Sequence, residues 1–301
     1  MRFSAWPGSA TKWEGLLDLC RHVERTGWDG LWVADHFMPN QADTSGPVQE
    51  VWTVLAAIGA TVPRVRIGSL VSGNTYRNPA VLAKQAAQVD IVSGGRLVLG
   101  IGAAWQENEH TAYGIPFYTV GGRLRRLEEA VQIIKSLFTE EQTTFKGRYY
   151  ELVDAPLAPK PVQRPHPPIL IGGGGEQVTL RLAAQYADEW NVWGAPEVLK
   201  QKGEVLERHC EAVGRDPKSI RRSANALVFL MDDPKALEAA RARGGRQAIF
   251  GNVAELQETM GRYVEAGVDE LIVPDFNLGR EVGQRKEAYD RFIEEVAPAF
   301  R

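Results

Sequence analysis

The stretch VRIGSLVSGNTYRNPAVLAKQAAQVDIVSGGRLVLGIG covers residues 65–102 and decides the fold class. It holds an apolar run at 65–71, a helical apolar repeat at 78–93 that begins at a proline, and a second apolar run at 96–102. Both runs have strand length and lack polar alternation, which is typical of parallel strands covered on both faces. The stretch therefore predicts a strand–helix–strand unit.

The same alternation continues on both sides of this unit. Upstream, the pattern predicts strands at 3–6 and 30–34 and helices at 12–26 and 47–60. Downstream, it predicts helices at 121–139, 177–187, 196–213, 234–243, 253–266 and 284–297, and strands at 168–175, 191–193, 221–231 and 269–275. RTGWDGLWVA (25–34) and EAGVDELIVP (265–274) repeat one order of helix end, glycine and strand. We therefore expect an α/β fold, a (β/α)8 TIM barrel forming a single domain over 1–301, with a doubly wound open sheet as the alternative.

One segment interrupts the alternation. Residues 140–167 contain no helical face, and TTFKGRYYELVD within them is typical of a hairpin with Lys146 and Gly147 at its tip. A proline-rich connector follows the hairpin. We interpret 140–167 as an insertion between the fourth helix and the fifth strand.

Composition excludes several classes of protein. The 301 residues carry 35 Lys and Arg against 38 Asp and Glu, a net charge of −3, which argues against a nucleic-acid partner. The two cysteines, Cys20 and Cys210, lie far apart in helical patterns and predict neither a disulfide framework nor a zinc site. No apolar run is long enough to span a membrane, and the N-terminus does not resemble a secretory signal, so a cytoplasmic location is expected.

Ligand and catalytic groups of such barrels come from the carboxyl ends of the strands. There the sequence places Asp35 and His36, and a histidine can give or take a proton near neutral pH. The alternative is a rim histidine that only bonds neighbouring loops. Four glycines at 172–175 stand between a strand and a helix, where backbone N–H groups can hold a phosphate, unless they form only a flexible turn. Asp35, His36 and Glu109 are a conceivable metal set, but adjacent residues rarely point at one ion, and no metal is expected.

The block IGSLVSGNTYRNPAVLAKQAAQVDIVSGGRLVLGIGAAWQENEHTAYGIPF (67–117) resembles the signature of the bacterial luciferase-like superfamily. GWDGLWVADHF (27–37), PHPPILIGGGGEQVTLRLAAQYADEWN (165–191) and AGVDELIVP (266–274) match in the same order. Together with TTFKGRYYELVDAPLAPKPVQ (143–163), these motifs are similar to the F420-dependent branch of flavin and deazaflavin oxidoreductases. The resemblance covers essentially the whole chain.

The resemblance implies coenzyme F420, or alternatively FMN, at the carboxyl mouth of the barrel. It implies a non-proline cis peptide at Ser69–Leu70 beside the middle ring, with Ser72 near the pyrimidine side. Asp35 and His36 match the Asp-His pair of deazaflavin-dependent sugar-phosphate dehydrogenases, in which the histidine is the proposed base. Further cofactor contacts are implied at Ala103, Ala104, Asn108, Gly173, Gly174 and Gly175.

Glu109 matches the glutamate of an Asn-Glu pair after the fourth strand, and we expect it to handle protons together with His36. The sugar-phosphate dehydrogenases carry a glutamate where this chain has Trp105, so glucose-6-phosphate is not the expected substrate. Trp105 and His110 are predicted to line an apolar pocket, which suits a conjugated carbonyl or other activated alkene.

Three functions stay open at this point. The first is hydride transfer between F420 and an organic substrate. The second is an FMN-dependent monooxygenase supplied by a flavin reductase, and the third is a flavin-binding protein without catalysis. A homodimer through helices at 47–60 and 78–92 is also expected from the resemblance, with a small molecule as substrate.

Overall fold

The computed structural model describes residues 1–8 and 10–301. Contacts between residues group the chain into two compact units. The first unit contains Met1–Gly8, Trp13–Trp32 and Gly173–Arg301. The second unit contains Val33–Gly172 and a short piece at 10–12.

The first unit is built on a parallel sheet. Its strands follow the order β2 (Gly30–Val33), β1 (Arg2–Trp6), β13 (Glu270–Pro274), β10 (Arg221–Asn225) and β9 (Glu189–Trp193). All five residues of β13 are buried, as expected for a strand covered on both faces. The helices of the unit are α1 (Trp13–Arg25), α6 (Thr179–Tyr186), α7 (Pro196–Ala212), α8 (Pro234–Arg243), α9 (Val253–Glu265) and α10 (Val282–Arg291), which π and 3-10 turns extend to Phe300.

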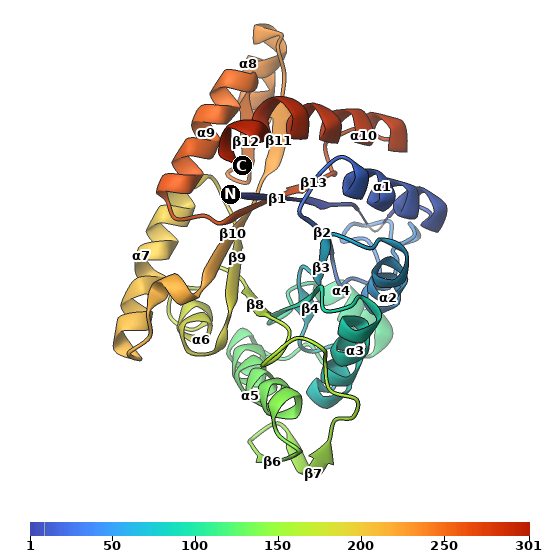
Figure 1. Cartoon of the computed structure of the whole chain (residues 1–301), viewed down its shortest axis with the longest axis vertical. Helices are drawn as coiled ribbons and strands as arrows, with labels where there is room; N and C mark the ends of the chain where they lie inside the picture. The colour runs from blue at the N-terminus through green and yellow to red at the C-terminus, as the bar shows by residue number, and fades with distance from the viewer. Residues whose placement is uncertain (9) are drawn as a thin grey trace. The chain divides into compact units, whose positions relative to one another are not determined.

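The second unit holds the other parallel strands. β5 (Leu97–Gly102) pairs with β3 (Arg66–Ser69), with the two-residue β4 (Ser72–Gly73) and with β8 (Ile169–Gly172). All six residues of β5 are buried. The helices are α2 (Val51–Thr61), α3 (Pro79–Val92), α4 (Glu107–Tyr113) and α5 (Val120–Thr139), and α3 packs against both α2 and α5 (Figure 1).

Local sequence explains where these helices begin. The side chain of Asn78 accepts a hydrogen bond from the N–H of Ala80, and Pro79 stands in the first turn, where its missing N–H costs nothing. The carboxylate of Glu50 caps α2 and the hydroxyl of Thr119 caps α5 in the same way. Helix α3 therefore starts a few residues after β4, whereas long loops that carry predicted site residues separate β2 from α2 and β5 from α5.

The fold class predicted from the sequence is confirmed. Within the described residues, eight parallel strands alternate with helices, namely β1, β2, β3, β5, β8, β9, β10 and β13. This is the order of a (β/α)8 barrel. The predicted insertion is confirmed as an antiparallel hairpin, β6 (Gln142–Lys146) and β7 (Glu151–Pro156), followed by an extended connector.

Three element predictions were wrong, and one helix was missed. The single strand predicted at 221–231 is two strands, and the second, β11 (Leu227–Leu230), pairs with the unpredicted β12 (Ala248–Gly251) in a separate sheet. Helix α4 was missed because its seven residues are too few to show a helical period. Helix α2 begins at Val51 rather than at 47. The hairpin loop is 147–150 rather than Lys146–Gly147, because Gly147 N–H bonds the carbonyl of Tyr150.

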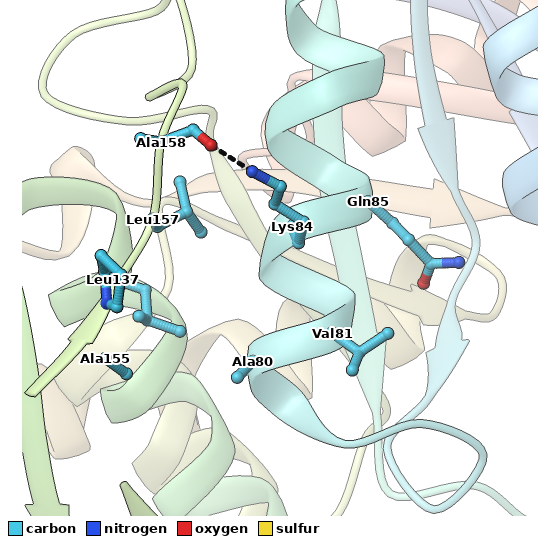
Figure 2. A pocket seen from close by; sticks show the side chains of 9 residues that line it. Ala80, Val81, Lys84, Gln85, Leu137, Ala155, Leu157 and Ala158 are labelled. Atoms are coloured by element: carbon cyan, nitrogen blue, oxygen red, sulfur yellow. Dashed lines mark hydrogen bonds between the residues drawn. The ribbon is translucent and has the colours of Figure 1, made fainter. Parts of the chain in front are cut away.

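A cavity of about 450 Å³ lies between α3, α5 and the connector of the insertion (Figure 2). Lys84 reaches across from α3 and donates a hydrogen bond to the carbonyl of Ala158. The cavity is lined mostly by small and apolar side chains, and none of the predicted site residues is among them. This opening therefore belongs to the helical layer of the second unit.

No helix in the described part of the chain is both long and apolar enough to cross a bilayer. Across residues 1–8 and 10–301, no three His, Cys, Asp or Glu side chains gather in a way that would hold a metal ion.

Candidate functional site

A hydrogen-bond network in the second unit joins three loops that follow strand ends. The loops begin after β2, after β4 and after β5. Glu109, on α4, is the centre of the network and is fully buried. One oxygen, Oε1, faces His36 Nδ1 at 2.9 Å and accepts a hydrogen bond from the hydroxyl of Tyr76. The other, Oε2, accepts the backbone N–H of Phe37 at 2.7 Å.

Burial works against a charge on Glu109, but these hydrogen bonds outweigh it. Together they hold the pKa of Glu109 below its ordinary value, with the bond from His36 the strongest of them. The carboxylate is therefore ionised at neutral pH. An ionised carboxylate accepts hydrogen bonds and donates none, so His36 Nδ1 carries a proton. That choice of tautomer follows from the partner atoms.

The other ring nitrogen of His36, Nε2, takes no part in the bond to Glu109 and is the atom that can exchange a proton with a ligand. The side chain of His36 is 25% exposed, and its ring meets the Trp105 ring edge-on with 5.4 Å between ring centres. Trp105 is 60% exposed. The pair places a histidine ring that can gain or lose a proton at Nε2 beside a large apolar surface. A buried carboxylate, an oriented imidazole and an open reacting side make the arrangement of a general acid or base.

Asp35, predicted as a cofactor contact, is held by the protein itself. Its carboxylate is buried, accepts the N–H of Gly73 at 3.1 Å and pairs with Arg77 Nη1 at 2.6 Å. Burial raises the pKa of Asp35, and the Arg77 guanidinium opposes that rise. Arg77 also donates to Glu50 at 2.6 Å. This chain of charges ties the loop after β2 to the turn after β4 and to the start of α2.

The cis peptide predicted at Ser69–Leu70 lies one bond further on, at Leu70–Val71. The hydroxyl of Ser69 donates to the carbonyl of Gly100 at 2.8 Å, so Ser69 is bonded into the strand layer. A Cβ at Gly100 would come within 1.9 Å of the Ser69 carbonyl oxygen. Ser72 is buried and accepts the indole N–H of Trp52 at 3.2 Å. The segment from β3 to β4 is therefore fixed by direct backbone contact with β5.

Asn74 supplies a test of whether this site fits a ligand. It follows β4 directly and is buried, and its Nδ2 forms no hydrogen bond of good geometry within the described residues. The side chain lies near the Tyr150 hydroxyl, where it opposes the rise that burial causes in the pKa of Tyr150. A buried amide N–H without an acceptor costs about 1–3 kcal/mol. A planar heterocycle with ring carbonyls, such as a flavin or a deazaflavin, would supply that acceptor. The residues present therefore fit a group of this kind.

Of the residues that follow β5, some are partly open to solvent and others form hydrogen bonds within the protein. Ala103 and Ala104 are half-buried, and Ala104 has a φ of 59°, which turns the chain toward Trp105. Asn108 donates to the carbonyl of Pro39 at 3.1 Å, so its side chain holds a neighbouring loop.

His110, predicted to line a substrate pocket, is fully buried and has both ring nitrogens engaged. Its Nδ1 donates to the carbonyl of Gln106 at 2.7 Å, and Nε2 lies 2.7 Å from the hydroxyl of Thr75. His110 thus supports the loops around the site, while Trp105 is the member of the predicted pair that is open.

The glycine run predicted to hold a phosphate lies at the start of the first unit. Gly173 has a φ of 122° and donates its N–H to the carbonyl of Asn191 at 2.9 Å. Gly173 and Gly175 are exposed. A Cβ at Gly175 would come within 2.8 Å of the Thr179 hydroxyl, which begins α6. The run therefore has the strand–glycine–helix form on which the prediction rests, and the phosphate stays a prediction.

Tyr76, Arg77 and Asn74 were not among the predicted site residues. They stand together in NTYRNP (74–79), immediately after the strand that was identified. Polar residues directly after a barrel strand are a usable signal. Their partners, Glu109 and Asp35, lie 33 and 42 residues away, and pairings at that separation are invisible to periodicity.

Comparison with known proteins agrees with this picture. The F420-dependent glucose-6-phosphate dehydrogenase of Kineococcus radiotolerans is 36% identical over 232 residues, covering 75% of this chain and 67% of that protein. The F420-dependent hydroxymycolic acid dehydrogenase of Mycobacterium tuberculosis is 31% identical over 232 residues, covering 75% of this chain and 61% of that protein.

Two solved structures share the fold. An F420-dependent secondary alcohol dehydrogenase matches 100% of this chain and 99% of its own, with a TM-score of 0.84 and 22% identity. A monooxygenase from Streptomyces bottropensis matches 100% of both chains, with a TM-score of 0.82 and 20% identity. A model of the luciferase-like monooxygenase family matches residues 1–292. The chain belongs to the luciferase-like monooxygenase family and is an oxidoreductase of that family.

Proposed function

We propose that the protein transfers a hydride between coenzyme F420 and an organic substrate, with His36 exchanging the accompanying proton. The observation that carries the proposal is the Glu109–His36 pair, because it leaves one oriented nitrogen facing an open apolar surface. The two relatives above, each named as an F420-dependent dehydrogenase, support F420 as the cofactor.

When bound, F420 supplies the chemistry of a two-electron hydride carrier. Asn74 would meet a ring carbonyl. Leu70 stays a proposed contact of the ring system from the family resemblance. Ser72, Ala103, Ala104 and the glycines at 173–175 stay proposed contacts from the family resemblance. Asp35 holds the loop that carries His36.

The protein's own residues account for the proton. In the reducing direction, protonated His36 gives the Nε2 proton to the substrate oxygen, or to the carbon beside the one that receives the hydride. In the oxidising direction, neutral Nε2 takes the proton of a substrate hydroxyl. Glu109 stabilises the imidazolium in both directions, since it bonds Nδ1 throughout. Geometry of this kind contributes about 10²–10⁴-fold to a rate.

The substrate is proposed to be apolar, such as a conjugated carbonyl, an activated alkene or the corresponding alcohol. Trp105 presents an indole where a second carboxylate would favour a polar sugar. Glucose-6-phosphate is therefore proposed to be a poor substrate, although relatives carry that name.

A second candidate is an FMN-dependent monooxygenase that receives reduced flavin from a reductase. The description of the family and the likeness to a monooxygenase favour it. Titrating the purified protein with F420 and with FMN, each followed by fluorescence, separates the two. Tighter binding of F420, then turnover of enones with reduced F420, supports the proposal. Tighter binding of FMN with oxygen uptake, or rapid turnover of glucose-6-phosphate, contradicts it.

A further inference from the structure

Three aromatic side chains of the first unit meet where strands β1, β9 and β13 end. We call Trp6, Trp193 and Phe276 the aromatic trio. Trp6 is the last residue of β1 and Trp193 is the last of β9, whereas Phe276 stands two residues after β13. The ring centre of Trp6 lies 5.1 Å from that of Phe276 and 5.5 Å from that of Trp193. The carboxyl ends of strands are where this fold carries the groups that contact ligands.

Trp6, which contacts both other rings, carries a hydrogen-bond donor without an acceptor. Trp6 is only 7% exposed, and its Nε1 has no partner within the described residues. Neither neighbouring ring supplies an acceptor atom, since a phenyl ring has none and an indole N–H only donates. A buried N–H without an acceptor destabilises the protein, and a ligand that supplies the acceptor recovers that loss.

Hydrogen bonds fix the backbone that carries two of the rings. The N–H of Asp275 donates to the carbonyl of Trp6 at 3.1 Å, which ties the loop after β13 to the end of β1. The Asp275 carboxylate accepts the N–H of Gly8 at 2.9 Å and pairs with Arg285 at 3.1 Å. Trp6 and Phe276 are therefore held by ordered segments, so little backbone order has to be gained when a ligand binds.

The aromatic trio is partly open to solvent. Phe276 is 56% exposed and Trp193 is half-buried, so apolar ring surface faces water. An exposed side chain such as that of Phe276 changes rotamer within picoseconds to nanoseconds, which lets a ligand atom reach the Trp6 N–H. A ligand that covers these rings also removes their apolar surface from water, and this favours binding.

We propose that the aromatic trio is a binding site for a flat aromatic ring that carries a hydrogen-bond acceptor, as in an aryl ketone. Aromatic rings pack on one another edge-on or offset, which favours a flat ring over a puckered one. The Trp6 N–H selects an acceptor, because a hydrogen bond in apolar surroundings is stronger than one in water. The inference does not depend on the proposed function, since neither a cofactor nor His36 enters it.

Three small probes separate the flat ring from the acceptor. Acetophenone has both, isopropenylbenzene has the same shape without the acceptor, and cyclohexyl methyl ketone carries the acceptor on a puckered ring. The dissociation constant of each is measured by ¹H–¹⁵N NMR of the full chain labelled at its tryptophans. We expect acetophenone to bind about fivefold more tightly than either of the others. It should move the Trp6 indole resonance further downfield than isopropenylbenzene does, and leave that of the fully buried Trp28 in place.

Two variants remove the donor and a ring separately. Trp6→Phe should bring the dissociation constants of acetophenone and isopropenylbenzene together. The matched control Trp13→Phe, at a half-buried tryptophan of the same unit, should keep the wild-type ratio. Phe276→Leu keeps an apolar side chain without a ring, so the preference for acetophenone over cyclohexyl methyl ketone should fall. Because Phe276 is exposed, this variant tests the trio even if Trp6→Phe folds poorly.

Several results would make the inference wrong. Equal dissociation constants of acetophenone and isopropenylbenzene in the wild type would mean that the Trp6 N–H already faces an aromatic ring and selects nothing. A Trp6 resonance that no probe moves, or wild-type ratios in both Trp6→Phe and Phe276→Leu, would mean that the trio is packing alone. The proposed function survives each of these results, because titration with F420 and FMN tests it separately.

Discussion

Replacing Glu109 with glutamine removes the charge that orients His36 and leaves the volume of the side chain almost unchanged. The carboxylate accepts three hydrogen bonds, from His36, from the N–H of Phe37 and from the hydroxyl of Tyr76. A glutamine offers one oxygen and one N–H₂ group in the same place. The N–H₂ group must then face a donor, so at least one of the three bonds is lost.

The size of the effect follows from the kind of bond. A hydrogen bond to a charged group is worth about 1.5–3 kcal/mol, so losing the bond to His36 should lower kcat/KM by about 10- to 150-fold. One buried donor left without a partner should also lower the free energy of unfolding by about 1–3 kcal/mol.

The stability loss should depend on pH in a defined direction. Hydrogen bonds lower the pKa of Glu109 in the folded protein from the ordinary value of 4.5. Its ionisation therefore contributes stability that is fully present above pH 4.5 and is lost as pH falls through the lowered value. Wild type and Glu109→Gln should differ most near neutral pH and converge in acid.

Urea unfolding at several pH values measures the stability, and ¹⁵N NMR of the histidine rings reports the tautomer of His36 without any cofactor. Tyr76→Phe is the control, because it removes a donor to Glu109 and keeps the carboxylate. It should change kcat/KM by less than about tenfold and leave the tautomer as it is. An unchanged His36 tautomer in Glu109→Gln, with kcat/KM near the wild-type value, would refute the reasoning.

Three further predictions concern packing, charge and assembly. Gly100→Ala should lower the free energy of unfolding by about 3 kcal/mol or more, because the new Cβ would meet the carbonyl oxygen of Ser69 at 1.9 Å. Gly261→Ala, which has nothing within 4 Å of the new Cβ, should raise the free energy of unfolding by about 0.5–1 kcal/mol. Thermal unfolding of both variants tests this pair of predictions. Arg285→Met should lower the free energy of unfolding by about 3–5 kcal/mol at pH 7, because the buried Asp275 carboxylate loses its ion-pair partner. The loss should be smaller at pH 4, because burial raises the pKa of Asp275 and the carboxyl group is then more often neutral. Chemical unfolding at the two pH values checks this. If the proposed homodimer forms through α2 and α3, Val81→Glu, at a side chain 53% exposed, should shift sedimentation from dimer to monomer, and an unchanged profile argues against that interface.

The order of elements could be predicted because it depends on short-range chemistry. The apolar runs of β5 and β8 show no alternation, which indicates strands buried on both faces. Asn78 and Pro79 mark the start of α3, and Gly27, with a φ of 88°, ends the segment after α1. Periodicity does not detect a helix shorter than two turns, such as α4, and it does not separate two strands joined by one residue, such as β10 and β11.

The candidate site could be predicted only as a set of strand ends. The sequence indicates that Asp35, His36 and Glu109 follow barrel strands and favours His36 as the acid or base, but chain position does not say which carboxylate His36 pairs with. The structure separates them: Asp35 is bound to Arg77, Glu109 is buried among three donors, and His36 keeps an open nitrogen. Which carboxylate neutralises an arginine and which orients an imidazole depends on contacts across 42 and 73 residues of chain. Periodicity and capping act over a few residues, whereas those pairings form only when the strands and helices pack, and so the tertiary structure alone decides them.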